Sequence, residues 1–88
     1  MDAYSLFHKP SVEKDLRKIP LAFHLPIVRK IQQLANQPIT AKSVKLAGSD
    51  HYYRIRVGDY RVVYEVDHRL KQVTVHYVRH RRDVYRSL

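Results

Sequence analysis

A period of two in the segment YYRIRVGDYRVVYEV, residues 52–66, where apolar and basic residues alternate around a Gly-Asp pair, constrains the fold more than any other feature of this sequence. Successive side chains of a β-strand point to opposite faces, so the pattern predicts strands over Tyr52–Val57 and Tyr60–Asp67. Gly58 and Asp59 between them suit a type II′ turn, because glycine accepts a positive φ at the first central position. The segment therefore predicts an antiparallel hairpin.

The tight turn also predicts which residues of the two strands lie opposite each other. Arg56 is expected to pair with Arg61, and Arg54 with Val63. One face then carries Tyr53, Ile55, Val57, Tyr60, Val62 and Tyr64, and the other carries the three arginines. Like charges directly across two strands destabilise a sheet, by roughly 1 kcal/mol in water. We therefore expect the arginines to bind phosphate, which their planar guanidinium groups contact bidentately.

The segments outside the hairpin complete an α+β pattern. Tyr4–His8 is expected to form a first strand, SVKL from Ser43 a short strand or an extended lead-in, and Gln72–Val78 a last strand. We expect a small antiparallel sheet made of the N-terminal strand and the C-terminal meander. A short helical tail is predicted from about Arg82.

Two helices are predicted between the first strand and the hairpin. The first begins at Pro10 or Ser11 and ends before Pro20, with apolar residues at helical spacing. Pro26 is unfavourable inside a helix, so either the second helix is distorted early or its regular part begins near Leu25. Their apolar stripes predict that both helices pack on one face of the sheet.

Composition narrows the class of partner. The chain has 88 residues, a length typical of one domain, and we treat residues 1–88 as a single unit. Its 17 lysines and arginines against 8 acids leave a formal net charge of +9, which favours binding to a polyanion such as nucleic acid. The absence of cysteine fits a reducing cytoplasm. No apolar run is long enough to span a membrane, and none forms a signal peptide.

A second basic cluster, RHRRDVYR, follows the last predicted strand at residues 79–86. Strict alternation from Val73 would place His76 and His80 on the arginine face and would send Arg79 toward the helices unless the strand bends. The histidines do not fall at metal-ligand spacings, so we predict neither a metal site nor a cofactor.

Three segments of the chain are similar to the RelE/ParE superfamily of bacterial toxins. They are KLAGSDHYYRIRVGDYRVVYEV (Lys45–Val66), VRHRRDVYR (Val78–Arg86) and the helical SVEKDLRKIP. The resemblance implies the toxin of a type II toxin–antitoxin system, held inactive by a cognate antitoxin. RelE-like members are endoribonucleases that cut mRNA in the ribosomal A site. ParE-like members share the fold but poison DNA gyrase.

The resemblance also implies a set of site residues. The basic and tyrosine positions of the RelE-like active face fall on Arg54, Arg56, Arg61, Arg79 and Tyr85. Well-studied RelE enzymes have lysines at the first two positions. Arginine keeps its proton far above neutral pH and is a poor base. Tyr85 and His80 therefore remain the two candidates for the general base, and Arg81 and Arg82 are expected to add RNA contacts.

The function implied by the resemblance is metal-independent cleavage of mRNA by the RNA's own 2′-oxygen, which would leave a 2′,3′-cyclic phosphate and a 5′-OH. Three alternatives stay open. The chain could be a ParE-like gyrase inhibitor, a non-catalytic nucleic-acid-binding module, or a degenerate toxin that still binds its antitoxin. The expected partners are mRNA in the ribosomal A site and an antitoxin protein. A heterotetramer is one form that the toxin–antitoxin complex could take. No membrane partner is expected.

Overall fold

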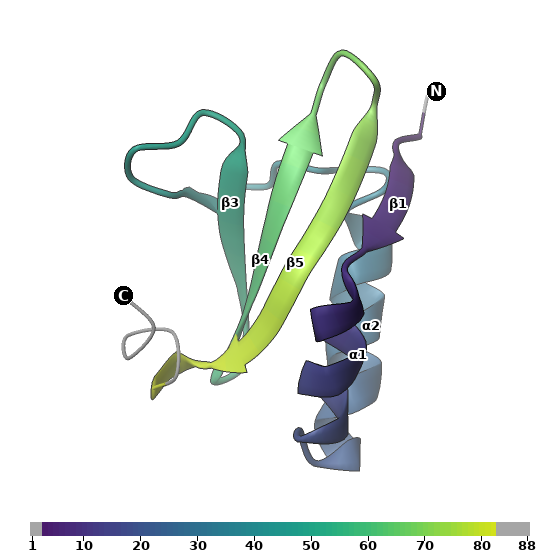
Figure 1. The fold of residues 1–88 in the computed structure, drawn as a ribbon, viewed down its shortest axis with the longest axis vertical. Coiled ribbons are helices and arrows are strands. Elements are labelled where there is room, and N and C mark those ends of the chain that lie inside the picture. Colours follow the sequence, from purple (N-terminus) through teal and green to yellow (C-terminus); the bar gives the residue numbers. More distant parts are fainter. Residues whose placement is uncertain (1–2, 83–88) are drawn as a thin grey trace.

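The computed structural model describes residues 3–82, in which two helices lie on one side of a five-stranded sheet (Figure 1). The chain begins with strand β1 (Ser5–His8), helix α1 (Pro10–Arg17), the 3-10 turn η1 (Leu21–Phe23) and helix α2 (His24–Gln33). It continues with the strands β2 (Val44–Lys45), β3 (Tyr52–Val57), β4 (Tyr60–Asp67) and β5 (Gln72–His80). The sheet order is β1-β5-β4-β3-β2. The predicted α+β class with two helices is confirmed.

The direction of β1 differs from the prediction. Strands β2 to β5 pair antiparallel, but β1 pairs parallel with β5, from Ser5 opposite Gln72 to His8 opposite Val75, so the sheet is mixed. The chain passes from β1 through Lys9 directly into α1, which runs on beside β5. The crossover through the two helices carries the chain from β1 to the opposite edge of the sheet. No local pattern in residues 4–8 encodes the direction of β1.

The hairpin formed by β3 and β4 has the predicted register. Arg56 lies opposite Arg61, Arg54 opposite Val63, and Val57 opposite Tyr60. Gly58 has φ of 59°, while Asp59 has no positive φ, as a type II′ turn requires. A side chain at position 58 would strain the backbone.

The hydrophobic core lies between the helices and the face of the sheet predicted to be apolar. It contains Val12, Ile19, Ile27 and Leu34 from the helical layer and Ile55, Tyr60, Val62, Tyr64, Val66, Val73, Val75 and Val78 from the sheet. Pro26 is accommodated because α2 begins at His24, which places the proline in the first turn, where its missing N–H would have no partner within the helix. The second helix therefore starts slightly earlier than expected.

A β-bulge interrupts the pairing of β4 with β5. Val63 lies opposite Tyr77, but the next residue, Tyr64, lies opposite Val75, so His76 is the extra residue. The bulge shifts the alternation of β5 by one position. Beyond it, Val78 faces the core and is 1% exposed, while Tyr77 lies on the face of Arg54. Strict alternation along β5 predicted the opposite.

Helix α1 supplies hydrogen bonds to the edge of β5 beyond the end of β1. The Ser11 hydroxyl donates to the carbonyl oxygen of His76 at 2.6 Å, and Asp15 Oδ2 accepts from the backbone N–H of Val78 at 3.0 Å. Ser11 and Asp15 are four residues apart and therefore share one face of the helix. These two bonds fix α1 against the bulged part of β5.

Replacing Asp15 by alanine is expected to lower the free energy of unfolding by about 1–3 kcal/mol, because a partly buried N–H loses a charged acceptor. Chemical denaturation would measure the change. Glu13→Ala is the matched control: Glu13 is an exposed acid of the same helix, and its loss is expected to change stability by less than about 0.5 kcal/mol. Equal effects of the two variants would contradict the role given to Asp15.

Tyr64 connects the loop after α2 to the sheet. Its hydroxyl donates to the carbonyl oxygen of Pro38 at 2.8 Å and lies 2.7 Å from Ser43 Oγ. Burial raises the pKa of Tyr64 above its ordinary value of 10.0, and the hydrogen bond from Ser43 offsets part of that rise. The neutral phenol is therefore the form that the fold favours.

The free energy of unfolding is expected to fall as the pH rises above about 10, because tyrosine in the unfolded chain loses its proton at a lower pH than folded Tyr64. The Tyr64→Phe variant should be less stable near neutral pH, but its stability should decline less steeply above pH 10. Denaturation curves at several alkaline pH values would compare the two slopes. Parallel slopes would show that Tyr64 does not couple folding to pH.

The end of the chain is described only as far as Arg82. Strand β5 extends to His80, two residues beyond the predicted end at Val78. The backbone N–H of Arg81 donates to the carbonyl oxygen of Asp59 at 2.8 Å. The helical tail predicted from about Arg82 falls on residues 83–88, which lie outside the described residues, as does Tyr85. Among residues 3–82, no helix has the length and apolar character needed to cross a membrane.

Candidate active site

Three arginines lie in one row across β3, β4 and β5, the three central strands of the sheet. Arg61 of β4 lies opposite Arg56 of β3 on one side and opposite Arg79 of β5 on the other. Arg54, two residues before Arg56, shares this face, which we call the arginine face and define by these four residues. The sequence predicted the Arg56–Arg61 pair, and the bulge at His76 brings Arg79 into the row.

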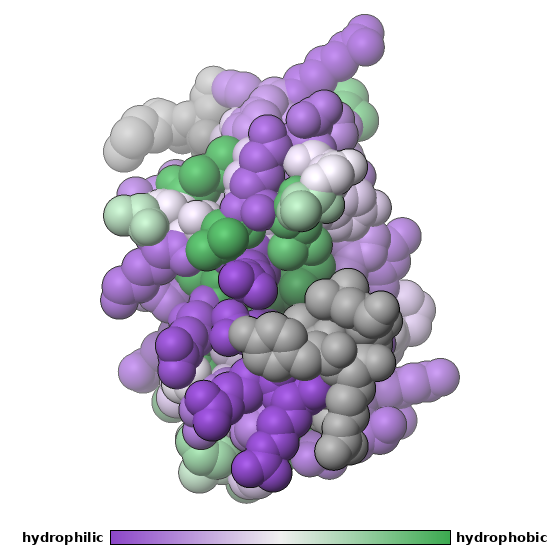
Figure 2. Space-filling view, turned by 90° about the vertical axis from the view of Figure 1, so that its left-hand side faces the viewer, coloured by the Kyte–Doolittle hydropathy of each residue, from purple (hydrophilic) through white to green (hydrophobic). Residues whose placement is uncertain are grey.

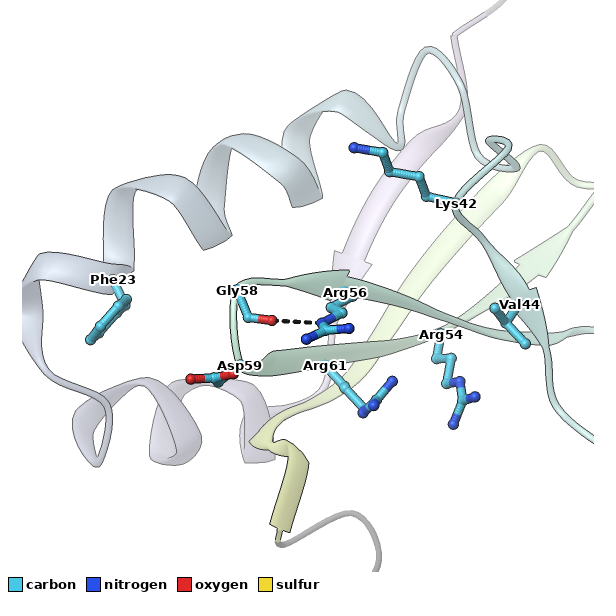
Figure 3. A pocket seen from close by; sticks show the side chains of 8 residues that line it. All are labelled: Phe23, Lys42, Val44, Arg54, Arg56, Gly58, Asp59 and Arg61. Carbon is cyan, nitrogen blue, oxygen red and sulfur yellow. Dashed lines mark hydrogen bonds between the residues drawn. The ribbon is translucent and has the colours of Figure 1, made fainter.

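Side chains around the hairpin form an open cleft of about 760 Å³. Figure 3 shows Arg54 and Arg61 extending to the same side of the hairpin, with Lys42 coming from the loop before β2. Phe23, from the turn between the helices, lies at the other end of the cleft, beyond the Gly58–Asp59 turn. Sequence reasoning missed Phe23 and Lys42, because the loops that carry them follow no strand or helix period.

The turn of the hairpin positions Arg56. Its Nε donates to the carbonyl oxygen of Gly58 at 2.9 Å, which folds the side chain back over the turn (Figure 3). Arginine has five N–H donors, so the terminal nitrogens can still contact an anion. The turn therefore helps to hold this guanidinium in place before any ligand binds.

Arg79 lies against an aromatic ring of its own strand. The centre of its guanidinium is 4.2 Å from the centroid of the Tyr77 ring, the geometry of a cation–π contact. Tyr77 lies opposite Val63, which in turn lies opposite Arg54. The contact therefore directs the Arg79 side chain from its own row toward the neighbouring row, which contains Tyr77, Val63 and Arg54.

His80 does not join the arginine face. It lies opposite Tyr60, whose ring belongs to the core side of the sheet, and the two rings meet edge to face at 5.4 Å. It lines a second cleft with Asp15 and Ile19 of the helical layer, and Arg79 borders that cleft as well. The position expected for His80 beside the arginines is thus wrong, because that expectation assumed strict alternation through the bulge.

The remaining basic residues of the cluster follow β5. Arg81 and Arg82 are both exposed, and the N–H of Arg82 lies 3.3 Å from Nδ1 of His80. Figure 2 looks at the side of the molecule on which β3 lies in Figure 1, and hydrophilic side chains gather over its lower part, near the end of β5.

The electrostatics of the arginine row favour an anion. Directly opposed side chains in neighbouring strands have Cβ atoms about 4.5–5.5 Å apart, so the charges of Arg56, Arg61 and Arg79 repel one another. A phosphate group bound among them would turn this repulsion into attraction and would accept bidentate hydrogen bonds. In residues 3–82, no group of three His, Cys, Asp or Glu side chains could hold a metal ion.

The structure also reveals a hydrogen-bonded pair of side chains that sequence reasoning did not find. His76 Nε2 lies 3.1 Å from Oε1 of Glu65, and the imidazole packs on the ring of Tyr52 with centroids 5.1 Å apart. His76 and Glu65 are far apart in the sequence and become neighbours through the bulge. No sequence signal marks that bulge, because β5 contains neither a glycine nor a proline.

The comparisons with known proteins agree with this architecture. Residues 6–85 match the family model of the ParE toxin of the type II toxin–antitoxin system parDE. A search of curated proteins gave no match to this chain.

Several solved toxins have a similar fold. RelE in the archaeal RelE–RelB complex from Pyrococcus horikoshii is 27% identical, with a TM-score of 0.79 over 90% of this chain and 96% of that one. The RelB–RelE antitoxin–toxin complex from Methanococcus jannaschii gives 28% identity and 0.77 over 93% and 98%. The isolated E. coli RelE toxin gives 25% identity and 0.76 over 98% and 100%.

The fold and the family match define a small toxin domain with a basic face. The chain belongs to the RelE/ParE toxin superfamily, the toxins of type II toxin–antitoxin systems. Its family model carries the ParE description, whereas the three solved structures compared above are RelE toxins, two of them crystallised with the antitoxin RelB.

Proposed function

We propose that this toxin is a ribosome-dependent endoribonuclease that cleaves mRNA in the ribosomal A site. The observation that carries the proposal is the row formed by Arg56, Arg61 and Arg79 across three neighbouring strands, with Arg54 beside it. A gyrase inhibitor that acts by binding a protein has no need of a phosphate site on this face. The similarity to RelE toxins, a fold whose members include ribosome-dependent ribonucleases, supports the same function.

The reaction is cleavage of the RNA backbone by its own 2′-hydroxyl. The 2′-oxygen gives up its proton and attacks phosphorus, the bond from phosphorus to the 5′-oxygen breaks, and that oxygen takes up a proton. The products are a 2′,3′-cyclic phosphate and a 5′-OH. Arg61 and Arg79, with Arg54 and Arg56, bind the non-bridging oxygens and stabilise the negative charge that grows on them in the transition state.

Arg81 and Arg82 extend the basic surface beyond the row, where they would contact flanking phosphates of the mRNA. No arginine of the row serves well as a base, because the guanidinium keeps its proton at neutral pH. Of the two candidates from the sequence, His80 lies on the core side of the sheet, and Tyr85 lies outside the described residues.

Mapping of 5′ ends in cellular RNA after induced expression would test the nuclease function. We expect new 5′ ends within translated reading frames, and we expect them to disappear when translation initiation of the same transcript is blocked. The Arg61→Ala, Arg79→Ala double variant is the control for cleavage by host nucleases. Intact transcripts in cells that express the parent toxin would overturn the proposal.

The description of the matched family model favours a second candidate, inhibition of DNA gyrase. The two functions predict different cellular effects. A nuclease stops protein synthesis and leaves gyrase-catalysed supercoiling unchanged, whereas a gyrase inhibitor blocks supercoiling by purified enzyme without cutting RNA. Adding the purified toxin to gyrase and relaxed plasmid separates the two.

We also propose a cognate antitoxin as the second partner, because relatives were crystallised with RelB. A net charge of +9 suits an acidic antitoxin segment that folds on contact with the toxin. The proposed site of action, the ribosome, would place the active toxin in the cytoplasm.

A further inference from the structure

The imidazole at the bulge in β5 lies on the side of the sheet that carries the arginines. His76 is the extra residue of the bulge, and its ring lies against Tyr52, which is in β3 two positions before Arg54. The same bulge turns His80 to the core side of the sheet. Alternation placed both histidines on the arginine face, and the bulge leaves His76 there and removes His80.

We propose that His76, oriented by Glu65, is the general base that takes the proton from the attacking 2′-hydroxyl of the RNA. The inference rests on the proposed nuclease function and deepens it. It supplies the group that a site built from arginines lacks, because imidazole is the side chain best suited to exchange protons near neutral pH.

The contact with Glu65 determines how the imidazole is used. His76 Nε2 lies 3.1 Å from Oε1 of Glu65, so in the neutral ring the Nε2–H donates to the carboxylate and Nδ1 carries the lone pair. The carboxylate also stabilises the imidazolium that forms when Nδ1 accepts a proton. A histidine oriented by a carboxylate is the arrangement found in catalytic triads.

The position of the pair suits proton transfer beside a phosphate held by arginine. His76 and Arg79 line one cleft of about 560 Å³ together with Tyr77 and Tyr52. Arg79 lies over the ring of Tyr77, and Tyr77 is the residue directly after His76. The guanidinium therefore extends toward the histidine. A phosphate bound to Arg79 in this cleft would bring the adjoining ribose close to the imidazole.

The pair is also partly shielded from water. The side chains of His76 and Glu65 are 23% and 38% exposed. The charged and titratable groups around the histidine are Glu65 from β4, Tyr52 from β3, Arg79 from its own strand, and Lys9 at the start of α1, which borders the same cleft. Ser11 bonds the backbone carbonyl of His76 and so fixes the bulge that orients the ring.

In the proposed step, Nδ1 of His76 takes the 2′-proton while the bond from the 2′-oxygen to phosphorus forms. The bond from phosphorus to the 5′-oxygen breaks, and the 5′-oxygen takes a proton from water. The imidazolium of His76 then returns its proton to solvent. No electrons are gained or lost, and no metal or cofactor takes part.

The test measures single-turnover cleavage of mRNA on programmed ribosomes by toxin released from its antitoxin complex. His76→Ala is expected to lower the rate constant by about 10²–10⁴-fold, the usual contribution of general acid–base catalysis. Added imidazole should restore part of the rate in this variant. Glu65→Gln should cause a smaller loss, because the ring stays but loses its orienting charge.

His8→Ala is the matched control, because His8 forms the same kind of pair with Glu13 at 3.3 Å on the edge strand β1. It should cleave like the parent. The rate of the parent should fall toward acidic pH as the base gains a proton, and the residual rate of His76→Ala should lack this fall. Thermal melting of each antitoxin complex, together with the milder His76→Gln variant, separates loss of the base from loss of folding.

Two results would overturn the inference. If folded His76→Ala cleaves as fast as the parent while Arg61→Ala is inactive, the nuclease function stands and His76 is not its base. If His76→Ala and His76→Gln lose activity but neither responds to imidazole nor changes the pH profile, the pair only supports the sheet. A parent toxin that leaves mRNA intact would remove the proposed function itself.

Discussion

Replacing Arg61 by alanine is expected to reduce the rate of mRNA cleavage by about 10²–10³-fold, the effect measured for loss of a single oxyanion donor. Arg61 is the central member of the row, with Arg56 and Arg79 on either side, so its guanidinium is best placed to contact a phosphate bound to either neighbour. Cleavage on programmed ribosomes at saturating toxin would measure the effect on the chemical step.

Two further variants sharpen this test. Arg61→Lys keeps the charge but loses the bidentate fork, so its rate should lie between those of the parent and the alanine variant. Arg69→Ala removes an exposed arginine from the turn between β4 and β5, and it should cleave like the parent if position rather than net charge matters. Equal losses in Arg69→Ala and Arg61→Ala would show that the arginine row contributes only general attraction to RNA.

Replacing Ile55 by alanine is expected to lower the free energy of unfolding by about 2–5 kcal/mol. Ile55 lies between Arg54 and Arg56 in the sequence but points to the opposite face, where it is 1% exposed within the core. Its truncation leaves a cavity directly beneath the arginine face. Denaturant titration of the toxin, freed from its antitoxin, would measure the loss.

Ile39→Ala serves as the comparison, because Ile39 is 41% exposed and its truncation removes the same atoms from a site that water already reaches. Its cost should be below about 1 kcal/mol. A similar cost at both positions would contradict the placement of the core on the Ile55 side of the hairpin. Retained cleavage by the surviving folded fraction of Ile55→Ala would show that the two faces are separable.

Much of this fold could be predicted because its information is local. The tight turn at Gly58 and the alternation on either side of it are sufficient to pair Arg56 with Arg61 and to assign Ile55 to the core. The helices likewise follow from apolar spacing and from Pro10 at the first helical position. These features depend on residues close together in the chain, where steric and periodic rules apply.

The features that escaped prediction depend on distant residues. The direction of β1 is set by its pairing with β5, whose partner residues lie more than 60 positions away. The bulge at His76 coincides with a hydrogen bond from Ser11 of α1, and no local pattern in β5 predicts it. The removal of His80 from the arginine face follows from that single irregularity, and so does the inclusion of Arg79 in the row.

The bulge sets the phase of the end of β5 by a single extra residue. If β5 paired regularly with β4 and kept that residue, Arg79 would turn toward the helical layer and His80 would join the arginine face. Deleting His76 would instead leave a regular strand in which Arg79 still lies opposite Arg61, so the face would lose its histidine and keep its arginines. In this toxin, the pairing of β5 is therefore as much a part of the site as the identity of its residues.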